Sequence, residues 1–312
     1  MTASVPAGLR VVAKRLFEEG VTRSGLSRLS RALRPARGAV LAYHNVVPEG
    51  QLPRGEAAVH VPAGLFRKHL DAIGRTHEVV SLETLLTEEG ETDRPRVAIT
   101  FDDAYRGAIT NGLRETAERG FPATVFVAPG LLGREEFWWD RLADGTGTID
   151  PETREAALGR AWGDQDAVLE RWSPGRPPGE GELRPLPPAC RPSTREELKE
   201  AVADRPGVSV GSHTWSHLCL PSCDEQTIAS ELERSDRWLR SHLGERYLPC
   251  VSFPYGRYTD EAVEQAARTY RWALRIDGGL VPGGDVDLLV PRINVPSGLS
   301  ARGLLVRLSG LL

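Results

Sequence analysis

Two adjacent carboxylates, Asp102 and Asp103, stand at the end of a short apolar run, residues 97–101. The run is rich in β-branched residues and is bounded by Pro95 and Gly107, so it predicts a buried strand. Neighbouring residues of a strand point to opposite sides, so two consecutive acids indicate that the strand opens into a loop or cleft. Solvated loop acids or a helix N-cap would be the plainer explanation. The C-terminal ends of strands are, however, where α/β folds place catalytic groups.

A second strand-like run, residues 208–211, leads into His213 and His217. Two imidazoles four residues apart reach one metal ion if the segment is helical or tightly turned. Structural histidines beside Trp215 are the alternative. With the two earlier carboxylates, the pair supplies two nitrogen ligands and one oxygen ligand, and it leaves a second carboxylate free as a base. This set favours zinc or a similar divalent ion with open positions for water and substrate.

These residues and a third block resemble a known family. Thr100–Asp103 and Ser212–His217 look like the first two signature motifs of the polysaccharide deacetylases, the nodulation-type chitooligosaccharide deacetylase domain of carbohydrate esterase family 4. Residues 252–258, SFPYGRY, resemble the aromatic groove motif of that family. The three blocks occur in the family's order, and the resemblance covers roughly residues 38–300.

The resemblance implies a metal-dependent hydrolase that acts on carbon–nitrogen bonds other than peptide bonds and removes N-acetyl groups from an amino-sugar saccharide or glycoconjugate. It implies that Asp103, His213 and His217 hold the metal and that Asp102 is the general base for the metal-activated water. Zinc is the expected metal, with cobalt or nickel as alternatives. The expected substrate is an N-acetylated saccharide or a glycolipid precursor.

The same resemblance suggests further roles. The backbone N–H of Tyr255 would bind the developing oxyanion, while Pro254 and the Tyr255 ring line the groove. The family usually takes its general acid from a histidine near the C-terminus, but this chain has no histidine after His242. His44, in a Tyr-His start that resembles the exopolysaccharide glucosamine deacetylase branch, is the substitute, and a structural histidine is the alternative. Arg292 would orient the general base, with a surface salt bridge as the alternative.

Two tryptophans, Trp138 and Trp139, begin a segment rich in Pro, Gly and charge, residues 137–194. We interpret this segment as an insertion with a helix near residues 151–172 and a long loop. Tryptophans at the rim of a cleft are platforms for sugar rings, whereas burial in the core is the alternative for an aromatic cluster.

The rest of the chain must position these residues. Strands are expected at residues 38–45, 97–101, 123–128, 208–211, 250–253, 272–276 and 288–294, and helices at residues 65–73, 81–86, 105–119, 224–243 and 259–269. Such alternation favours a parallel sheet. The sequence therefore predicts an α/β fold, a distorted (β/α)7-type barrel with a helical and loop insertion and with every motif at a strand's C-terminal end. The expected divisions are an N-terminal helical extension (1–37), the barrel (38–300) and a C-terminal tail (301–312).

Composition narrows the function classes. The 312 residues carry a formal charge of −4 at pH 7, which argues against a nucleic-acid partner, and 40% are hydrophobic, which is enough for a sizeable core. No run approaches the ~20 apolar residues that span a bilayer, and the first twenty residues lack a secretory core. We therefore expect a cytoplasmic protein with reduced cysteines and peripheral membrane contact through the basic residues of 1–37.

Two other functions stay open. A catalytically inactive carbohydrate-binding barrel is favoured by the missing C-terminal histidine. A metal-dependent amidohydrolase acting on a non-sugar amide would use the same site.

Overall fold

The structure is a computed structural model that describes residues 36–51, 54–88, 93–173 and 186–310. The helical extension predicted for residues 1–37 therefore lies outside the described residues, apart from the first two residues of strand β1. Within the described chain, ten strands form one sheet and two form a small parallel pair. The strands of the main sheet are β1 Ala36–Tyr43, β4 Glu78–Val79, β5 Arg96–Phe101, β6 Ala123–Val127, β7 Val208–Ser212, β8 Tyr247–Ser252, β9 Trp272–Arg275, β10 Val281–Pro282, β11 Leu289–Pro291 and β12 Ile293–Asn294, and the pair is β2 Asn45–Val47 with β3 His60–Pro62.

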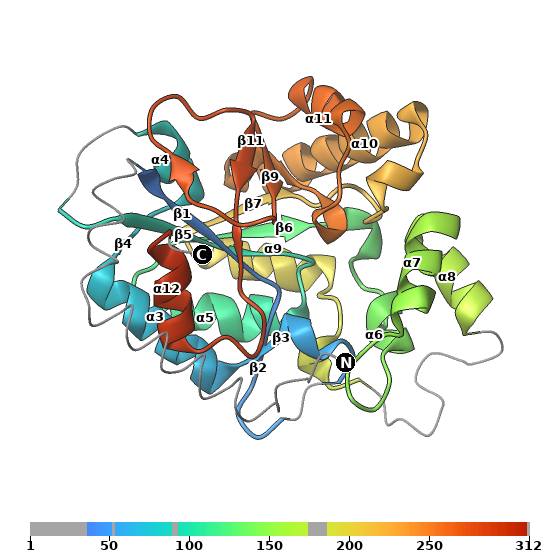
Figure 1. Ribbon diagram of the computed structural model, residues 1–312, viewed down its shortest axis with the longest axis horizontal. Coiled ribbons are helices and arrows are strands. Elements are labelled where there is room, and N and C mark those ends of the chain that lie inside the picture. Colours follow the sequence, from blue (N-terminus) through green and yellow to red (C-terminus); the bar gives the residue numbers. More distant parts are fainter. Residues whose placement is uncertain (1–35, 52–53, 89–92, 174–185, 311–312) are drawn as a thin grey trace, which may run out of the picture.

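The main sheet runs in the order β10-β1-β5-β6-β7-β8-β9-β11 and is parallel except where β1 meets β10. β11 pairs with β9, β12 pairs with β1, and a single residue, Arg292, separates β11 from β12. The chain therefore bridges the two ends of the sheet, which nearly closes on itself (Figure 1). This confirms the predicted distorted (β/α) barrel.

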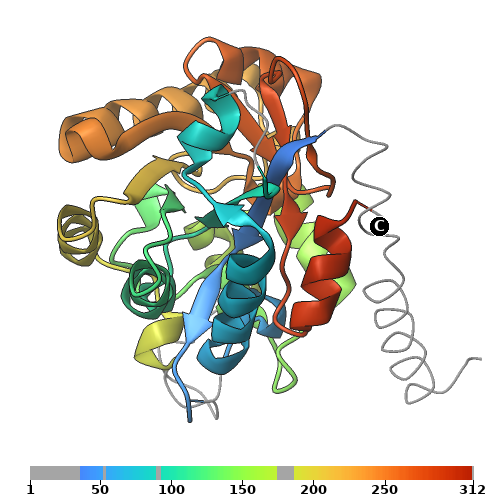
Figure 2. The same cartoon turned by 90° about the vertical axis from the view of Figure 1, so that its left-hand side faces the viewer.

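Helices cover the outside of the barrel (Figure 1). They are α3 Ala63–Thr76, α4 Leu82–Thr87, α5 Leu113–Ala117, α6 Trp138–Leu142, α7 Pro151–Arg160, α8 Gln165–Trp172, α9 Arg195–Ala203, α10 Glu225–Leu243, α11 Asp260–Ala267 and α12 Ala301–Leu308. Long α10 packs on α11, and α12, in the segment expected as a tail, lies beside α3 (Figure 2). Side-chain caps fix several helix starts, as where Asp224 accepts the N–H of Thr227 at the start of α10.

Side chains that point into the barrel are stacked in layers. Val40, Ala98, Phe126, Cys250 and Val290, from five different strands, belong to one buried apolar cluster. Residues two positions apart on a strand share a face. The next inward residues are therefore Thr100 on β5, Ser252 on β8 and Arg292 between β11 and β12, and this layer is polar. The functional side chains lie above it at the C-terminal ends of the strands.

The helix predicted at residues 105–119 forms with an irregularity. A π-type segment at Ala108–Gly112 precedes α5. A Cβ on Gly107 would lie 2.3 Å from the side-chain oxygen of Asn45 and 2.5 Å from the carbonyl oxygen of Val46, so the backbone packs directly on β2 here. π-type segments are frequent near functional sites.

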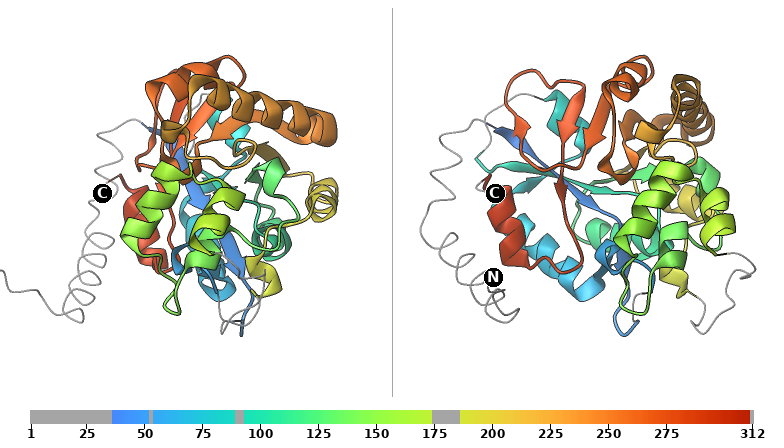
Figure 3. Two further views of the ribbon diagram at one scale, coloured as in Figure 1. Left: turned by 90° about the vertical axis from the view of Figure 1, so that its right-hand side faces the viewer. Right: turned by 45° about the vertical axis from the view of Figure 1, so that its right-hand side comes forward.

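The insertion differs from the single helix predicted near residues 151–172. Two helices, α7 and α8, form there instead, because Trp162 (φ 56°) and Gly163 (φ 70°) adopt left-handed backbone that an α-helix excludes. Figure 3 shows these two helices in yellow-green as a pair standing outside the ring of strands. All four cysteines are free thiols, as predicted. No helix in the described residues has the length and apolar character needed to cross a membrane.

Candidate metal centre

The two carboxylates follow β5 directly, and the backbone turns sharply between them. Asp102 continues the sheet pairing, since its N–H donates to the carbonyl oxygen of Tyr43 at 2.9 Å. Asp103 and Ala104 then adopt positive φ angles of 67° and 54°, which non-glycine residues rarely do. Both carboxylates are buried as a result. Backbone of this kind costs free energy and concentrates at functional sites.

The segment after β7 is a tight turn. The N–H of His213 donates to the carbonyl oxygen of Val127 at 2.7 Å, and Thr214 and His217 have φ angles of 61° and 62°. The buried carboxylate of Glu231, on α10, accepts the N–H groups of the two residues between them, at 3.1 and 2.8 Å. This turn returns the second histidine to the first, with ring centroids 4.6 Å apart.

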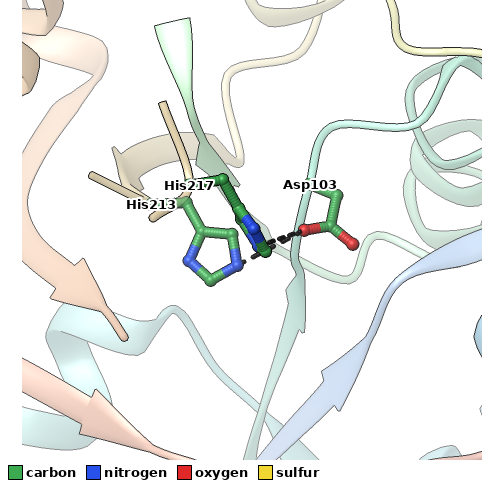
Figure 4. A group of neighbouring side chains, drawn as sticks. All are labelled: Asp103, His213 and His217. Carbon is green, nitrogen blue, oxygen red and sulfur yellow. Dashed lines mark ion pairs between the residues drawn. The ribbon is translucent and has the colours of Figure 1, made fainter. Parts of the chain in front are cut away.

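Asp103, His213 and His217 converge on one point (Figure 4). The Nε2 atoms of His213 and His217 lie 3.4 and 3.1 Å from Oδ1 of Asp103. One ligand atom from each of the three residues falls within 4.8 Å of the others, and all three residues are buried. The structure therefore brings together the three residues predicted as ligands.

The hydrogen bonds and burial of these three residues leave lone pairs that a cation can bind. Nδ1 of His213 lies 2.7 Å from the carbonyl oxygen of Ser252, so it carries the ring proton and Nε2 is left with a free lone pair. Burial lowers the pKa of His217 and so favours its neutral form. Among the described atoms, Oδ1 of Asp103 has no hydrogen-bond donor of good geometry. Two imidazole Nε2 atoms and one orphaned carboxylate oxygen fit a zinc-like divalent ion.

Asp102 is held mainly by Arg292, and its Oδ2 also lies 4.0 Å from Nε2 of His213. Nη1 and Nη2 of Arg292 donate to Oδ1 and Oδ2 of Asp102, each at 2.7 Å, and both side chains are buried. The same guanidinium donates to Ser252 Oγ at 2.6 Å and to Thr100 Oγ1 at 3.1 Å, which are the polar layer above the apolar interior. The neighbouring strand β9 ends in another arginine, Arg275, but this one forms an ion pair with the exposed Asp277.

The surroundings keep both carboxylates ionised. Burial by itself would raise the pKa of Asp102, but Arg292 and, next, His213 outweigh it and bring the pKa below its usual range. Burial likewise opposes ionisation of Asp103, whose contacts with His213 and His217 lower its pKa further still. Both are therefore anions near neutral pH.

A cavity of about 280 Å³ opens above these residues. Predicted site residues on its wall include His44, the half-buried residue after β1, and Tyr255, together with the two carboxylates and the two histidines. Tyr255 has a φ of 58°, and its ring centroid lies 4.5 Å from that of His217.

The remaining predicted residues divide between this wall and the layer behind it. Trp139 lines the cavity, whereas Trp138 is fully buried and donates its Nε1–H to the hydroxyl of Tyr255 at 3.0 Å. Pro254, which was expected to line the groove, is instead buried outside the lining, as is Arg292. The two tryptophans thus divide between the two alternatives, one at the cleft and one in the core.

Sequence reasoning missed two charged residues of the cavity. Glu56, from the loop before β3, and Arg154, from α7, both line it and form an ion pair with each other. Their positions depend on how the insertion folds back on the barrel, and no local motif marks them. Glu231 holds the turn between His213 and His217, but in the sequence it cannot be told from an ordinary helix residue.

The family model described as polysaccharide deacetylase matches residues 89–270, more than half of the chain. The chain belongs to the polysaccharide deacetylase family. This member is therefore a hydrolase of carbon–nitrogen bonds other than peptide bonds, in a family of metal-dependent enzymes that act on N-acetylated polysaccharides. Its placement in the branch with an N-terminal Tyr-His motif remains a prediction.

Relatives of this deacetylase agree in fold. YxkH from Bacillus subtilis (strain 168), which is described as a polysaccharide deacetylase, is 21% identical over 272 residues, covering 86% of this chain and 74% of that protein. The structure of the Streptococcus pyogenes deacetylase PplD in complex with acetate superposes with a TM-score of 0.58 at 18% identity, covering 86% of this chain and 97% of that one. The structure of IcaB from Ammonifex degensii gives 0.59 at 18% identity, with 88% and 98% covered.

Proposed function

We propose that this deacetylase removes N-acetyl groups from an amino-sugar saccharide or glycoconjugate with a single zinc ion held by Asp103, His213 and His217. The observation that carries the proposal is the shared cavity. The three converging ligands, the ionised Asp102 and His44 all face it. Its volume of about 280 Å³ is near the lower end for small-molecule sites, which suits one sugar unit with its acetamide.

The chain's own residues supply the proton transfers. A zinc ion at the three ligands would lower the pKa of a water molecule and withdraw electrons from the acetamide oxygen. Asp102 takes a proton from the attacking water as the water oxygen bonds to the acetyl carbon. Arg292 fixes the direction of the Asp102 carboxylate through its two parallel hydrogen bonds.

Cleavage then requires a proton for the leaving nitrogen. The carbon–nitrogen bond breaks with its electron pair going to nitrogen, and His44 donates a proton there to give the free amine and acetate. The backbone N–H of Tyr255 stabilises the negative charge on the former carbonyl oxygen. His44 suits this role because it reaches the cavity from β1, a different strand from those of the ligands and the base.

The family and the cavity support the proposed substrate class. An N-acetylated saccharide or a glycolipid precursor remains the proposed substrate. The cytoplasmic location and the peripheral membrane contact proposed with it depend on residues outside the described ones, so fractionation of the native protein at low and high salt is the test of both.

Acetate release from N-acetylated chitooligosaccharides by the zinc-loaded protein tests the proposal. We expect turnover that chelation abolishes, and a fall of about 10² to 10⁴-fold in Asp102→Asn. A protein that binds the saccharide but releases no acetate would be the inactive carbohydrate-binding barrel. Release from a simple acetamide but from no sugar would identify an amidohydrolase of small amides.

A further inference from the structure

The part of the cavity wall that the insertion forms is supported by a buried polar network. This network has no role in the mechanism above. Its centre is Asp140, on α6, whose side chain is fully buried. Tyr105 donates its hydroxyl to Oδ2 of Asp140 at 2.6 Å, and the N–H of Glu56 donates to Oδ1 at 2.8 Å. Burial and the nearby Asp140 charge raise the pKa of Tyr105, so the phenol keeps the proton that it donates.

A histidine adds a third contact to this carboxylate. The side-chain amide of Asn45 lies 3.0 Å from Nδ1 of His60 and donates to it, which leaves the ring proton on Nε2. That Nε2 lies 3.3 Å from Oδ1 of Asp140, a close polar contact without hydrogen-bond geometry. The carboxylate therefore joins the insertion to the β2–β3 pair, and each contact limits its movement.

Two parts of the cavity wall depend on Asp140. The indole N–H of Trp139 donates to the Tyr105 hydroxyl at 2.7 Å, and the indole ring lies against His217 with centroids 4.8 Å apart. The second part is Glu56. The Asp140 carboxylate accepts the backbone N–H of Glu56, and the Glu56 side chain lines the cavity.

Local backbone is shaped around the same group. Gly55 has a φ of 93°, and a Cβ there would lie 2.2 Å from Oδ1 of Asp140. Glycine is thus required for the loop before Glu56 to reach the carboxylate.

We propose that Asp140 is a positioning residue for the reaction. It holds Trp139 against His217 and holds Glu56 in the cavity wall, so that the sugar ring is seated with its acetamide at the metal centre. This inference rests on the proposed deacetylase function. It gives the insertion the role of positioning the substrate. Asp140 itself contacts neither the ligand group nor the proposed base.

The kinetic test compares Asp140→Asn and Tyr105→Phe with a matched control, Asp236→Asn. Asp236 also accepts a tyrosine hydroxyl at 2.6 Å, from Tyr247, but it lies on α10 away from the cavity. We expect kcat/KM for N-acetylated chitooligosaccharides to fall about tenfold to hundredfold in both network variants, chiefly through KM. The control should stay within about twofold of wild type while losing thermal stability.

A second measurement does not depend on turnover. In metal-free protein, Asp140→Asn and Tyr105→Phe should both change the tryptophan bands of the near-ultraviolet circular dichroism spectrum, and neither should change these bands further when made in a Trp139→Phe background. If Asp140→Asn does not fold, Tyr105→Phe, which removes only a hydroxyl, decides the question.

Wild-type KM together with an unchanged tryptophan spectrum would overturn the proposal, as would a kinetic loss no larger than that of Asp236→Asn. A wild-type protein without acetate release would defeat the proposed function instead. The spectra of the same variants would still decide whether Asp140 fixes Trp139.

Discussion

Arg292 and Asp102 are 190 positions apart in the sequence, yet both ends of the guanidinium pair with both oxygens of the carboxylate. Arg292 is the single residue between β11 and β12, where the chain crosses from one end of the sheet to the other. Closure of the barrel therefore places the Arg292 guanidinium beside Asp102, the proposed base. A buried ion pair of this geometry fixes direction as well as charge.

Replacing Arg292 should damage both activity and stability. Lysine cannot make two parallel hydrogen bonds, so we expect Arg292→Lys to lower kcat/KM about tenfold to hundredfold. Arg292→Met leaves a buried carboxylate without its cation and should lower the free energy of unfolding by about 3–5 kcal/mol, measured by urea denaturation.

A surface pair of the same geometry provides the control. Arg134 also donates from Nη1 and Nη2 to the two oxygens of Asp166, at 2.8 and 2.7 Å, but both side chains are exposed. Arg134→Lys should change the free energy of unfolding by less than about 1 kcal/mol and leave kcat/KM unchanged. Equal effects at the two sites would show that burial of the Asp102 pair has no special role.

Removing His217 should abolish tight zinc binding. One of three ligands is lost, so calorimetric titration of metal-stripped His217→Ala should show an affinity at least about a hundredfold below wild type. Asp102→Asn should bind zinc nearly as wild type does, because Asp102 is held by Arg292 and is not one of the three converging ligands. His242→Ala, on the exposed end of α10, is the control. Unaltered zinc affinity in His217→Ala would remove the metal centre from the proposal.

His44 should matter most when the leaving group needs a proton. We expect His44→Gln to lower kcat on an N-acetylated saccharide about 10² to 10⁴-fold, with zinc affinity unchanged. On 4-nitrophenyl acetate, whose leaving phenolate departs without a proton, the loss should be much smaller. An equal loss on both substrates would assign His44 to binding or structure and not to acid catalysis.

The strand-end positions of the site could be predicted from sequence because they depend on local pattern. The β5 run ending in Asp102 and the β7 run ending before His213 each show a buried strand followed by polar residues, and both strands form as expected. The role of Arg292 stayed open between orienting the base and a surface salt bridge, because its partner depends on β12 pairing with β1.

Other features of the site depend on tertiary packing. The left-handed backbone at Tyr255 is imposed by surrounding contacts, since a bulky aromatic residue rarely adopts it, whereas Asp103 and His217 belong to residue types that adopt it more often, and the sequence does not show which of them do. Similarly, Arg154 reaches the cavity only because α7 folds back over the loop that carries Glu56. The break between α7 and α8 does carry local signals, Gly163 after α7 and the N-cap Asp164 before α8, and only the left-handed backbone of Trp162 has none.

His69 should make stability depend on pH. The neutral ring is buried between α3, β1 and the C-terminal segment: Nε2 lies 2.8 Å from the carbonyl oxygen of Leu299, and Nδ1 accepts the hydroxyl of Tyr43 at 3.2 Å. Burial lowers the pKa of His69 in the folded state, and the hydrogen bond to Leu299 only partly offsets this. The unfolded chain therefore binds the proton more readily, at about pH 6.5.

It follows that the stabilisation from neutral His69 is complete above about pH 6.5 and is lost as the pH falls toward the lower folded-state pKa. We expect the free energy of unfolding of metal-stripped wild type to fall between pH 7 and pH 5 more steeply than that of His69→Gln, by up to ~1.4 kcal/mol for each unit of pKa separation. Urea denaturation across this range measures both slopes. His242→Gln, at an exposed histidine, should keep the wild-type slope. Parallel curves for wild type and His69→Gln would mean that His69 is not the group whose protonation opposes folding.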